Sequence, residues 1–186
     1  LINKSQPDEE LKFWVSGCAT GEEAYSLAIL IDEALSKSSL KLQIKIFATD
    51  INSNALEKAI LGVYPITIAN NITPERLEKY FIRQQDSFKV KRKLQKMLIF
   101  AHHDLSQDAV FTRINLIVCR NILMPMQPDL QHKTLLNLHF ALRKKGILFL
   151  GNAEHVGFLG DEFIPINRKH KFYSKRRDVN LHMPIP

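Results

Sequence analysis

Five short polar segments, each placed just after an apolar run, hold the residues whose types suit chemistry in this chain. They are residues 17–23, Asp50, Asp104, the pair Arg120 and Asn121, and residues 152–154. In open α/β sheets, ligands bind at the carboxyl ends of the strands. We therefore expect a ligand-binding edge here, although each residue alone also suits a structural role, such as a helix cap or, for Glu154, a pair with a surface lysine.

The first segment runs from an apolar strand through a turn of small residues directly into a helix, with the sequence FWVSGCATGEEAY at 13–25. Gly17 and Gly21 allow backbone conformations and close approaches that a side chain would block. The amides that open the next helix can face a polar ligand. The following strand ends at Asp50, whose carboxylate suits the two hydroxyls of a ribose. The two segments together indicate an adenosine-type ligand, whereas the glycines alone are equally compatible with a tight turn.

The charge of the first loop distinguishes between adenosine-type ligands. The loop has neither the Gly-Lys-Ser/Thr of a P-loop nor the full G-x-G-x-x-G pattern. Glu22 and Glu23 would repel a pyrophosphate but suit a ligand with positive charge. S-adenosylmethionine has an ammonium group, a sulfonium and no phosphate. The sequence therefore predicts S-adenosylmethionine as the cofactor and S-adenosylhomocysteine as its product.

Alternating strands and helices indicate an α/β fold. We expect strands at 12–16, 43–49, 97–101, 115–119 and 146–151, helices at 22–36, about 53–62 and about 128–142, and two final strands at 163–167 and 171–174. Such alternation is typical of parallel strands joined by right-handed crossovers. The rhythm breaks at 63–96, where Phe88, Val90 and Leu94 fall on one face of an expected strand. We interpret 1–62 and 97–186 as two halves of one domain and 63–96 as an inserted β-subdomain.

Composition limits the class of protein. A length of 186 residues with 45% hydrophobic residues suits one packed domain. No apolar run approaches the roughly 20 residues that cross a bilayer, and the first residues are not signal-like, so we expect a cytoplasmic protein that does not span a membrane. Cys18 and Cys119 lack metal-ligand spacing and follow strand-like runs. We expect two buried free thiols and no metal.

The net charge of +7 is concentrated at 89–96 and 168–177, which makes an acidic partner plausible. No zinc motif, recognition helix or aromatic binding sheet accompanies this charge. Nucleic acid is therefore not favoured as a partner, and a solvated basic face is the simpler interpretation.

The order of motifs resembles that of the chemotaxis receptor glutamate methyltransferase family (CheR), especially its versions in longer fusion proteins. The matching segments are SGCATGEEAYS (16–26), FATDI (47–51), LEKA with GVY (56–64), EKYF (78–81), CRN (119–121), GILFLG (146–151) and AEHVG (153–157). The resemblance covers nearly the whole chain. It implies a Rossmann-like class I methyltransferase sheet with helices on both faces. The insertion at 63–96 resembles the family's β-subdomain, which in some members docks a peptide at the receptor's tail.

The resemblance also implies roles for single residues. Glu23 would hold the amino-acid end of the cofactor, Asp50 the ribose hydroxyls, Asp104 and Leu105 the adenine, and Arg120 and Asn121 the methionyl portion, with Gly17 and Thr20 completing the cofactor site. The implied activity is methyl transfer to glutamates of a chemoreceptor or receptor-like signalling protein. Because a glutamate is already ionised at neutral pH, no general base is needed. We assign no catalytic residue, and we expect structural or surface roles for His102 and His103.

Two departures from the family pattern leave alternatives open. Pro125 stands where the family has a tyrosine at the reacting centre, and proline has no hydroxyl. The family's helical amino-terminal domain has no counterpart before the first strand, so we expect a fragment or trimmed member that binds S-adenosylmethionine more weakly than an intact relative. Both departures suit a catalytically weakened, cofactor-binding sensor or scaffold module. A nucleic-acid methyltransferase would explain the basic charge, but the Pro-Pro-Tyr-type sequence is absent.

Overall fold

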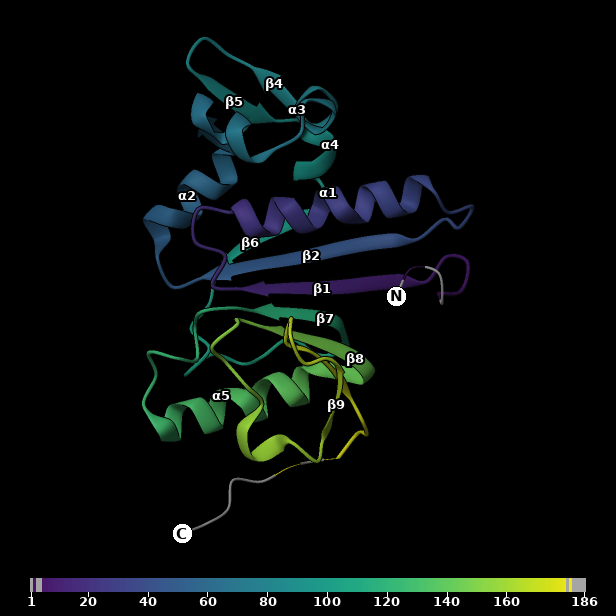
Figure 1. Cartoon of the computed structure of the whole chain (residues 1–186), viewed down its shortest axis with the longest axis vertical. Coiled ribbons are helices and arrows are strands. Elements are labelled where there is room, and N and C mark those ends of the chain that lie inside the picture. The colour runs from purple at the N-terminus through teal and green to yellow at the C-terminus, as the bar shows by residue number, and fades with distance from the viewer. Residues whose placement is uncertain (1, 3–4, 180, 182–186) are drawn as a thin grey trace. The chain divides into compact units, whose positions relative to one another are not determined.

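The computed structural model of the chain describes residues 2, 5–179 and 181. The chain divides into two compact units (Figure 1). Unit 1 comprises Leu1–Glu10 and Cys18–His102, and unit 2 comprises Leu11–Gly17 and His103–Pro186. Across the residues described, no helix combines the length and the apolar character that a membrane crossing requires.

Unit 1 is built around the parallel strands β2 (Gln43–Asp50) and β6 (Leu98–His102). Helix α1 (Glu22–Ser36) runs alongside β2 (Figure 1) and buries Ala24 and Ala28. Helix α2 (Ser53–Leu61) begins after Asn52, whose side chain accepts a hydrogen bond from the Ala55 amide at 3.1 Å. Asn52 is therefore the N-cap of α2, because its side-chain oxygen accepts from the amide three residues further along the chain.

Residues 63–96 of unit 1, which we expect to be an inserted subdomain and call the insert, contain a small antiparallel sheet in the order β3-β5-β4. Its elements are β3 (Val63–Pro65), η2 (Ile66–Asn71), α3 (Pro74–Tyr80), β4 (Phe81–Arg83), β5 (Ser87–Val90) and α4 (Arg92–Gln95). Phe88 and Val90 are buried on β5, but Leu94 lies in α4, so the expectation that all three share one strand face is wrong. The strand ends because the chain folds into a helical turn, in which the Leu94 amide bonds to the Lys91 carbonyl at 3.0 Å.

A buried carboxylate ties the insert to α1. Asp32 is 6% exposed and accepts hydrogen bonds from the Tyr80 hydroxyl at 3.0 Å and from the Lys93 ammonium at 2.6 Å. Burial raises the pKa of Asp32, but these two hydrogen bonds outweigh it and leave the pKa below its usual value. A second tie joins Arg76 to Glu33 through two parallel bonds of 2.7 and 2.8 Å. Both ties anchor the insert to one helix.

Unit 2 contains five strands in the order β1-β7-β8-β10-β9. These are β1 (Glu10–Ser16), β7 (Ile114–Cys119), β8 (Leu142–Leu150), β10 (Phe172–Lys175) and β9 (Phe163–Asn167), and they are accompanied by α5 (Pro128–Ala141) and η3 (Gly157–Leu159). β1, β7 and β8 pair in parallel, whereas β10 is antiparallel to both of its neighbours. Ile117, Leu138 and Leu148 are fully buried in the core. The expected parallel strands are present, and their carboxyl ends lead into the loops of interest.

His103 is part of the core of unit 2. Its ring lies 5.4 Å from Trp14 and 5.5 Å from Phe111, measured between ring centroids, and its Nε2 is 3.1 Å from the Ala109 carbonyl oxygen. The side chain is buried. His103 therefore has the structural role that the sequence predicts.

Candidate functional site

The loop that precedes α1 is held by the end of β2. The carboxylate of Asp50 accepts hydrogen bonds from the Ala19 amide at 2.8 Å and from the Asn52 amide at 2.9 Å. The Cys18 amide bonds to the Thr49 carbonyl at 2.9 Å. These contacts hold Ala19 in a left-handed conformation, with φ of 45°. Asp50 thus shapes the loop while its remaining lone pairs stay available to a ligand.

The same loop packs closely against α2 and β3. Gly21 has φ of 93°, and a Cβ on it would lie 2.9 Å from the Cβ of Ala59, so only glycine fits there. The Tyr64 hydroxyl donates to the Thr20 carbonyl at 2.8 Å, and the Thr20 hydroxyl donates to Glu22 at 2.6 Å. Both ends of the turn are therefore anchored, and its backbone is fixed before any ligand arrives.

The electrostatic potential at this loop is negative. Burial raises the pKa of Cys18 to about 12, and the charge of Asp50 is the next largest contribution, with smaller ones from Glu22 and Glu23. The loop residues 17–23 include no Lys or Arg. These carboxylates suit a ligand with a sulfonium and an ammonium group and disfavour a phosphate. Unit 1 thus places Thr20 at the loop that the Asp50 carboxylate holds, with Glu23 in the first turn of α1, and this acidic loop fits S-adenosylmethionine. The contacts of these three residues with the cofactor stay predictions.

In unit 2, Gly17 lies beside the end of β7. Ser16 of β1 is in register with Cys119 of β7, so the residues that follow them, Gly17 and Arg120, are neighbours. Gly17 has φ of 65°, and a Cβ there would collide with the side chain of Ile122. Asn121 also has a positive φ, 62°, and is exposed. Unit 2 therefore brings Gly17, Arg120 and Asn121 together at one strand edge.

The guanidinium of Arg120 stacks on an aromatic layer. Its central carbon lies 5.0 Å from the centre of the Phe149 ring, which in turn stacks on Phe172 with centroids 4.1 Å apart. Such stacking orients the planar cation without consuming its hydrogen-bond donors.

Asp104 and Leu105 lie on a separate loop of unit 2. The Asp104 carboxylate accepts hydrogen bonds from the Ser106 amide at 2.8 Å and from the Gln107 side chain at 3.1 Å, and the hydrogen bonds from Ser106 hold the pKa of Asp104 below its usual value. Lys133 of α5 donates to the Ser106 carbonyl at 2.7 Å. Leu105 is 7% exposed. The Asp104 carboxylate is thus engaged within its own loop, and the Leu105 side chain is buried.

Glu154 also lies at this edge, and the sequence analysis placed it among the polar residues that follow the strands without giving it a role in cofactor binding. Its side chain is 4% exposed and accepts four backbone hydrogen bonds, from Gly151 at 2.7 Å, Asn121 at 3.0 Å, Leu123 at 2.7 Å and Met124 at 3.4 Å. The alternative interpretation, in which Glu154 pairs with a surface lysine, is therefore wrong. The available signal was the acid that follows β8 within the AEHVG motif.

The carbonyl groups of the same loop are held by Gln131 of α5. Its side-chain amide donates to the Leu123 carbonyl at 2.8 Å and to the Met126 carbonyl at 3.1 Å. Glu154 and Gln131 together satisfy donors and acceptors of the segment that follows Arg120. The segment is therefore rigid where Asn121 and Pro125 emerge.

Other kinds of site are not supported by the described residues. Within 2, 5–179 and 181, no group of three or more His, Cys, Asp or Glu residues is arranged to hold a metal ion. Cys18 and Cys119 are free and buried, as the sequence predicts.

Comparison with solved structures identifies the fold. The DszA carbon methyltransferase shares the fold with a TM-score of 0.50 at 18% identity, over 85% of this chain and 33% of that one. The chain has the Rossmann-like fold of class I methyltransferases, so the expected fold class is confirmed.

Comparison with protein families identifies the chain more closely. The family described as CheR methyltransferase, SAM binding domain, matches residues 1–172, and the chain belongs to this family. It is 34% identical over 177 residues to an uncharacterized 104.1 kDa protein in the hypE 3′ region of Rhodobacter capsulatus. It is 31% identical over 160 residues to a chemotaxis protein methyltransferase of Escherichia coli K12. These matches confirm the predicted family, and with it S-adenosylmethionine as the cofactor.

The relatives are longer than this chain. The matches cover 95% of this chain but 19% of the Rhodobacter protein, and 83% of this chain but 55% of the Escherichia coli protein. A domain of this family therefore also occurs within a much larger protein, consistent with the predicted fusion type.

Proposed function

We propose that this chain transfers a methyl group from S-adenosylmethionine to glutamate carboxylates of a chemoreceptor or receptor-like signalling protein. The observation that carries the proposal is the acidic loop before α1, whose backbone is fixed by Asp50 in a chain of the CheR family. A negative, phosphate-excluding loop is what a sulfonium cofactor requires. The relative from Escherichia coli is named a chemotaxis protein methyltransferase, which supports a receptor as the acceptor.

The chemistry asks little of the protein's side chains. When bound, S-adenosylmethionine supplies an electrophilic methyl group on a positively charged sulfur. An ionised glutamate needs no general base, so the residues of the chain act by binding, aligning and excluding water. In this scheme Asp50 orients the ribose, Glu23 attracts the ammonium group, and Arg120 and Asn121 contact the methionyl portion.

Cys18 has the one thiol in this loop, and as a thiolate it could compete with the acceptor for the methyl group. Its thiol lies in the loop itself, and burial with the charge of Asp50 raises its pKa to about 12. The thiol therefore stays protonated at neutral pH and does not compete with the acceptor carboxylate for the methyl group.

Methyl-labelled cofactor tests the proposal directly. The chain, and a version extended by upstream sequence, would be incubated with tritiated S-adenosylmethionine and a purified receptor signalling domain. We expect label that mild base releases as methanol, because the product is a methyl ester. A receptor domain with glutamines at the candidate glutamates is the matched control and should stay unlabelled. Absence of base-labile label with both versions of the chain would refute the proposed function.

Pro125 stands where the family has a tyrosine, so the chain lacks the tyrosine hydroxyl at this position. This difference favours a second candidate function, a weakened cofactor-binding module of a larger signalling protein. Pro125 is exposed on the segment that Glu154 and Gln131 hold rigid. A tyrosine there would therefore present its hydroxyl from a fixed backbone. A gain in methyl transfer of about tenfold or more in Pro125→Tyr, or 1.4 kcal/mol, would support the weakened module. An unchanged rate would leave the enzyme as the better description.

A further inference from the structure

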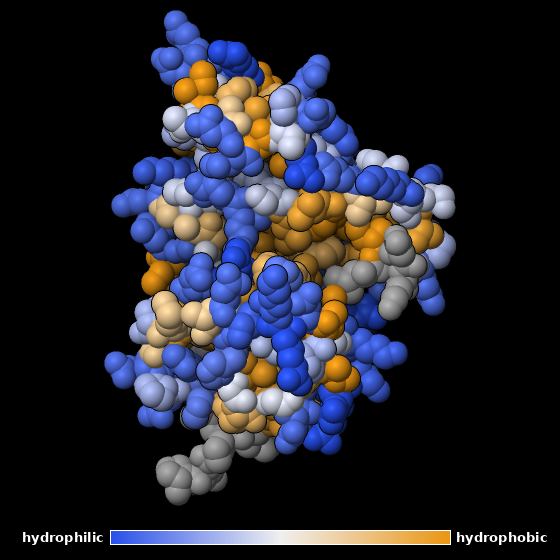
Figure 2. Space-filling model, in the orientation of Figure 1, coloured by the Kyte–Doolittle hydropathy of each residue, from blue (hydrophilic) through white to orange (hydrophobic). Residues whose placement is uncertain are grey.

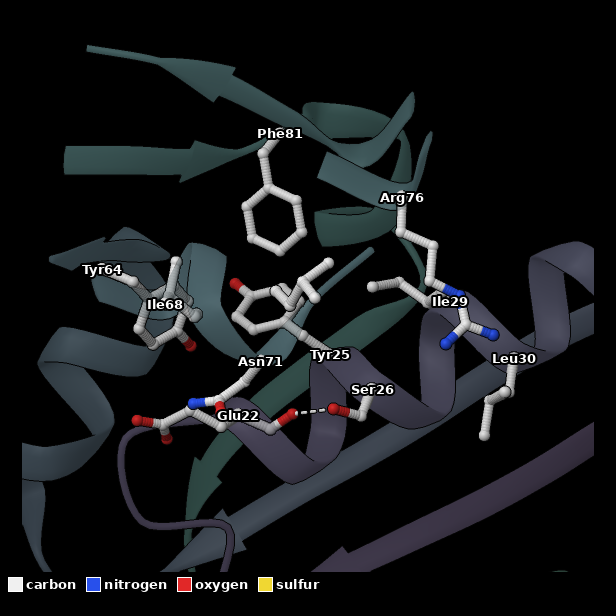
Figure 3. A pocket seen from close by; sticks show the side chains of 11 residues that line it. Glu22, Tyr25, Ser26, Ile29, Leu30, Tyr64, Ile68, Asn71, Arg76 and Phe81 are labelled. Carbon is white, nitrogen blue, oxygen red and sulfur yellow. Dashed lines mark hydrogen bonds between the residues drawn. The ribbon is translucent and has the colours of Figure 1, made fainter. Parts of the chain in front are cut away.

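Tyr64 of β3 reaches from the insert to the loop that precedes α1, and in Figure 3 its side chain points toward the start of this helix. Its hydroxyl donates to the Thr20 carbonyl at 2.8 Å, and the Thr20 hydroxyl donates to the Glu22 carboxylate at 2.6 Å. The Gly21 amide donates to the Cys18 carbonyl at 2.8 Å. The peptide group between Thr20 and Gly21 is therefore held by the insert at its carbonyl and by the loop at its N–H.

The Tyr64 hydroxyl is protonated and closely confined. Tyr64 is 5% exposed, and burial, followed by the charge of Glu22, raises the pKa of its hydroxyl. The hydroxyl therefore stays a donor at neutral pH. The ring meets that of Tyr25 edge-on, with centroids 6.1 Å apart, and a Cβ on Gly21 would lie 3.1 Å from the hydroxyl oxygen. A displacement of β3 would therefore break the hydrogen bond to Thr20.

A pocket limits the contact between the insert and α1. It has a volume of about 260 Å³ and lies between the two, with Tyr25 on the helix side and Phe81 on the insert side (Figure 3). Side chains on opposite walls of such a space make few van der Waals contacts. The insert therefore depends on local ties. Those at Asp32 and Glu33 join it to the second half of α1, whereas Tyr64 joins it to the loop before the helix.

The insert is too small to be stable by itself. Domains below about 40 residues usually need disulfides, a metal or a partner to fold, and the insert comprises residues 63–96. Ile66 and Ile82 are 39% and 52% exposed, and Figure 2 shows apolar residues among hydrophilic ones on the insert, at the top of the view. The stability of the insert therefore depends on its contacts with the rest of unit 1, and segments of this kind open locally more often than a core does.

We propose that Tyr64 is a positioning residue for the methyl donor, and that through it the insert and the loop before α1 stabilise each other. The proposal rests on the proposed function, because it takes this loop as the place where S-adenosylmethionine binds. The Tyr64 hydrogen bond orders the loop before the cofactor arrives, so less conformational entropy is lost on binding. By thermodynamic linkage, the bound cofactor stabilises the closed insert by the same factor by which the closed insert strengthens cofactor binding. The insert thereby regulates the affinity of the cofactor site from outside it.

Removing one hydroxyl tests the proposal. Tyr64→Phe keeps the ring and loses the hydrogen bond to Thr20. Tyr25→Phe is the matched control, because Tyr25 is also buried, lines the same pocket, and donates at 2.8 Å to a backbone carbonyl of α2, that of Ala59. We expect Tyr64→Phe to raise the Kd of S-adenosylhomocysteine, measured by calorimetry, about fivefold to thirtyfold, as the ordering of one further residue on binding would require. Tyr25→Phe should bind as tightly as the unaltered chain.

Two further measurements separate positioning from a loss of stability. Hydrogen exchange of the Val90 amide, which donates to the Gly62 carbonyl at 2.8 Å, reports opening of the insert. S-adenosylhomocysteine should slow this exchange in the unaltered chain and in Tyr25→Phe, and slow it less in Tyr64→Phe. In methyl transfer to a receptor signalling domain, Tyr64→Phe should raise the KM for S-adenosylmethionine and leave kcat unchanged, because the hydrogen bond acts equally in the ground state and the transition state.

Each alternative outcome overturns the proposal. Equal affinity of Tyr64→Phe and the unaltered chain would mean that the hydrogen bond does not order the loop, and an equal loss in Tyr25→Phe would trace the effect to stability. The exchange measurement needs no variant, because an insert that exchanges at the same rate with and without S-adenosylhomocysteine is not coupled to the site. Failure of methyl transfer with S-adenosylhomocysteine bound would refute the proposed function, while the comparison of the two variants still tests the role of Tyr64. Absence of S-adenosylhomocysteine binding to the unaltered chain would refute both.

Discussion

Glu154 offers the sharpest test of how the segment after β7 is held. In Glu154→Gln, one carboxylate oxygen becomes an NH2 group, which cannot accept the backbone hydrogen bonds that reach that oxygen. The Oε1 atom accepts hydrogen bonds from the amides of Leu123 and Met124, and the Oε2 atom accepts them from the amides of Gly151 and Asn121. Either orientation of the amide leaves two backbone donors without their acceptor. Each pair contains one buried donor, Leu123 or Gly151, and one part-buried donor. At about 1–3 kcal/mol for each donor left without an acceptor, the substitution should cost about 2–6 kcal/mol.

Urea unfolding measures this cost, with the slope taken to scale with the surface exposed. Trp14 is the only tryptophan and is fully buried in unit 2, so its fluorescence follows the unit that contains Glu154. Hydrogen exchange of the Asn121, Leu123, Met124 and Gly151 amides should accelerate in the variant. Asp161→Asn removes one negative charge from an exposed side chain and should leave both measurements unchanged.

The reasoning fails if Glu154→Gln unfolds within about 0.5 kcal/mol of the unaltered chain, the usual range of surface substitutions, and keeps its amide protection. That result would mean that the four hydrogen bonds contribute nothing beyond what water supplies.

Three further substitutions follow from single contacts. Asp50→Asn should weaken S-adenosylhomocysteine binding by about 1–3 kcal/mol, because charge-assisted bonds to the ribose are lost, and calorimetry with unchanged affinity would contradict the assignment. Asp32→Asn should destabilise the chain by about 1–3 kcal/mol at neutral pH. Because the folded pKa of Asp32 is lowered, its stabilisation is present above about 3.9, its unfolded value, and is lost as pH falls through the folded value; a constant difference at all pH would refute this. His139 is 1% exposed and burial lowers its pKa, so stability should fall as pH drops below about 6.5. His139→Leu should unfold with less pH dependence in that range, and an equal dependence would exclude His139 as its source.

Local signals in the sequence were sufficient for the main elements. The expected helix at 22–36 has the bounds of α1, because Gly21 and the first-turn acids mark its start and apolar residues recur at helical spacing. The last strands were also expected within one residue of β9 and β10. Such signals involve only neighbouring residues, so these helices and strands can be predicted from a single sequence.

Contacts between distant residues could not be predicted in the same way. Asp32 lies on the buried face of α1 because Tyr80 and Lys93 reach it from the insert, 48 and 61 positions along the chain. Glu154 is buried because the backbone of a loop about 30 residues earlier supplies its donors. Burying an unpaired carboxylate is costly in free energy, so the burial of Asp32 and Glu154 cannot be predicted until their distant partners are known. The cofactor residues were instead suggested by family motifs, and they stay predictions until a ligand is observed.

The placement of the two native thiols makes the chain convenient for chemical labelling. Cys18 and Cys119 are 3% and 0% exposed, so a maleimide dye will scarcely reach them in the folded state. A cysteine introduced at Ser26 or at Ser36 therefore becomes the single reactive position on the surface. A dye at either position would report binding of a partner close to it by a change in emission, and the unaltered chain serves as the unlabelled control.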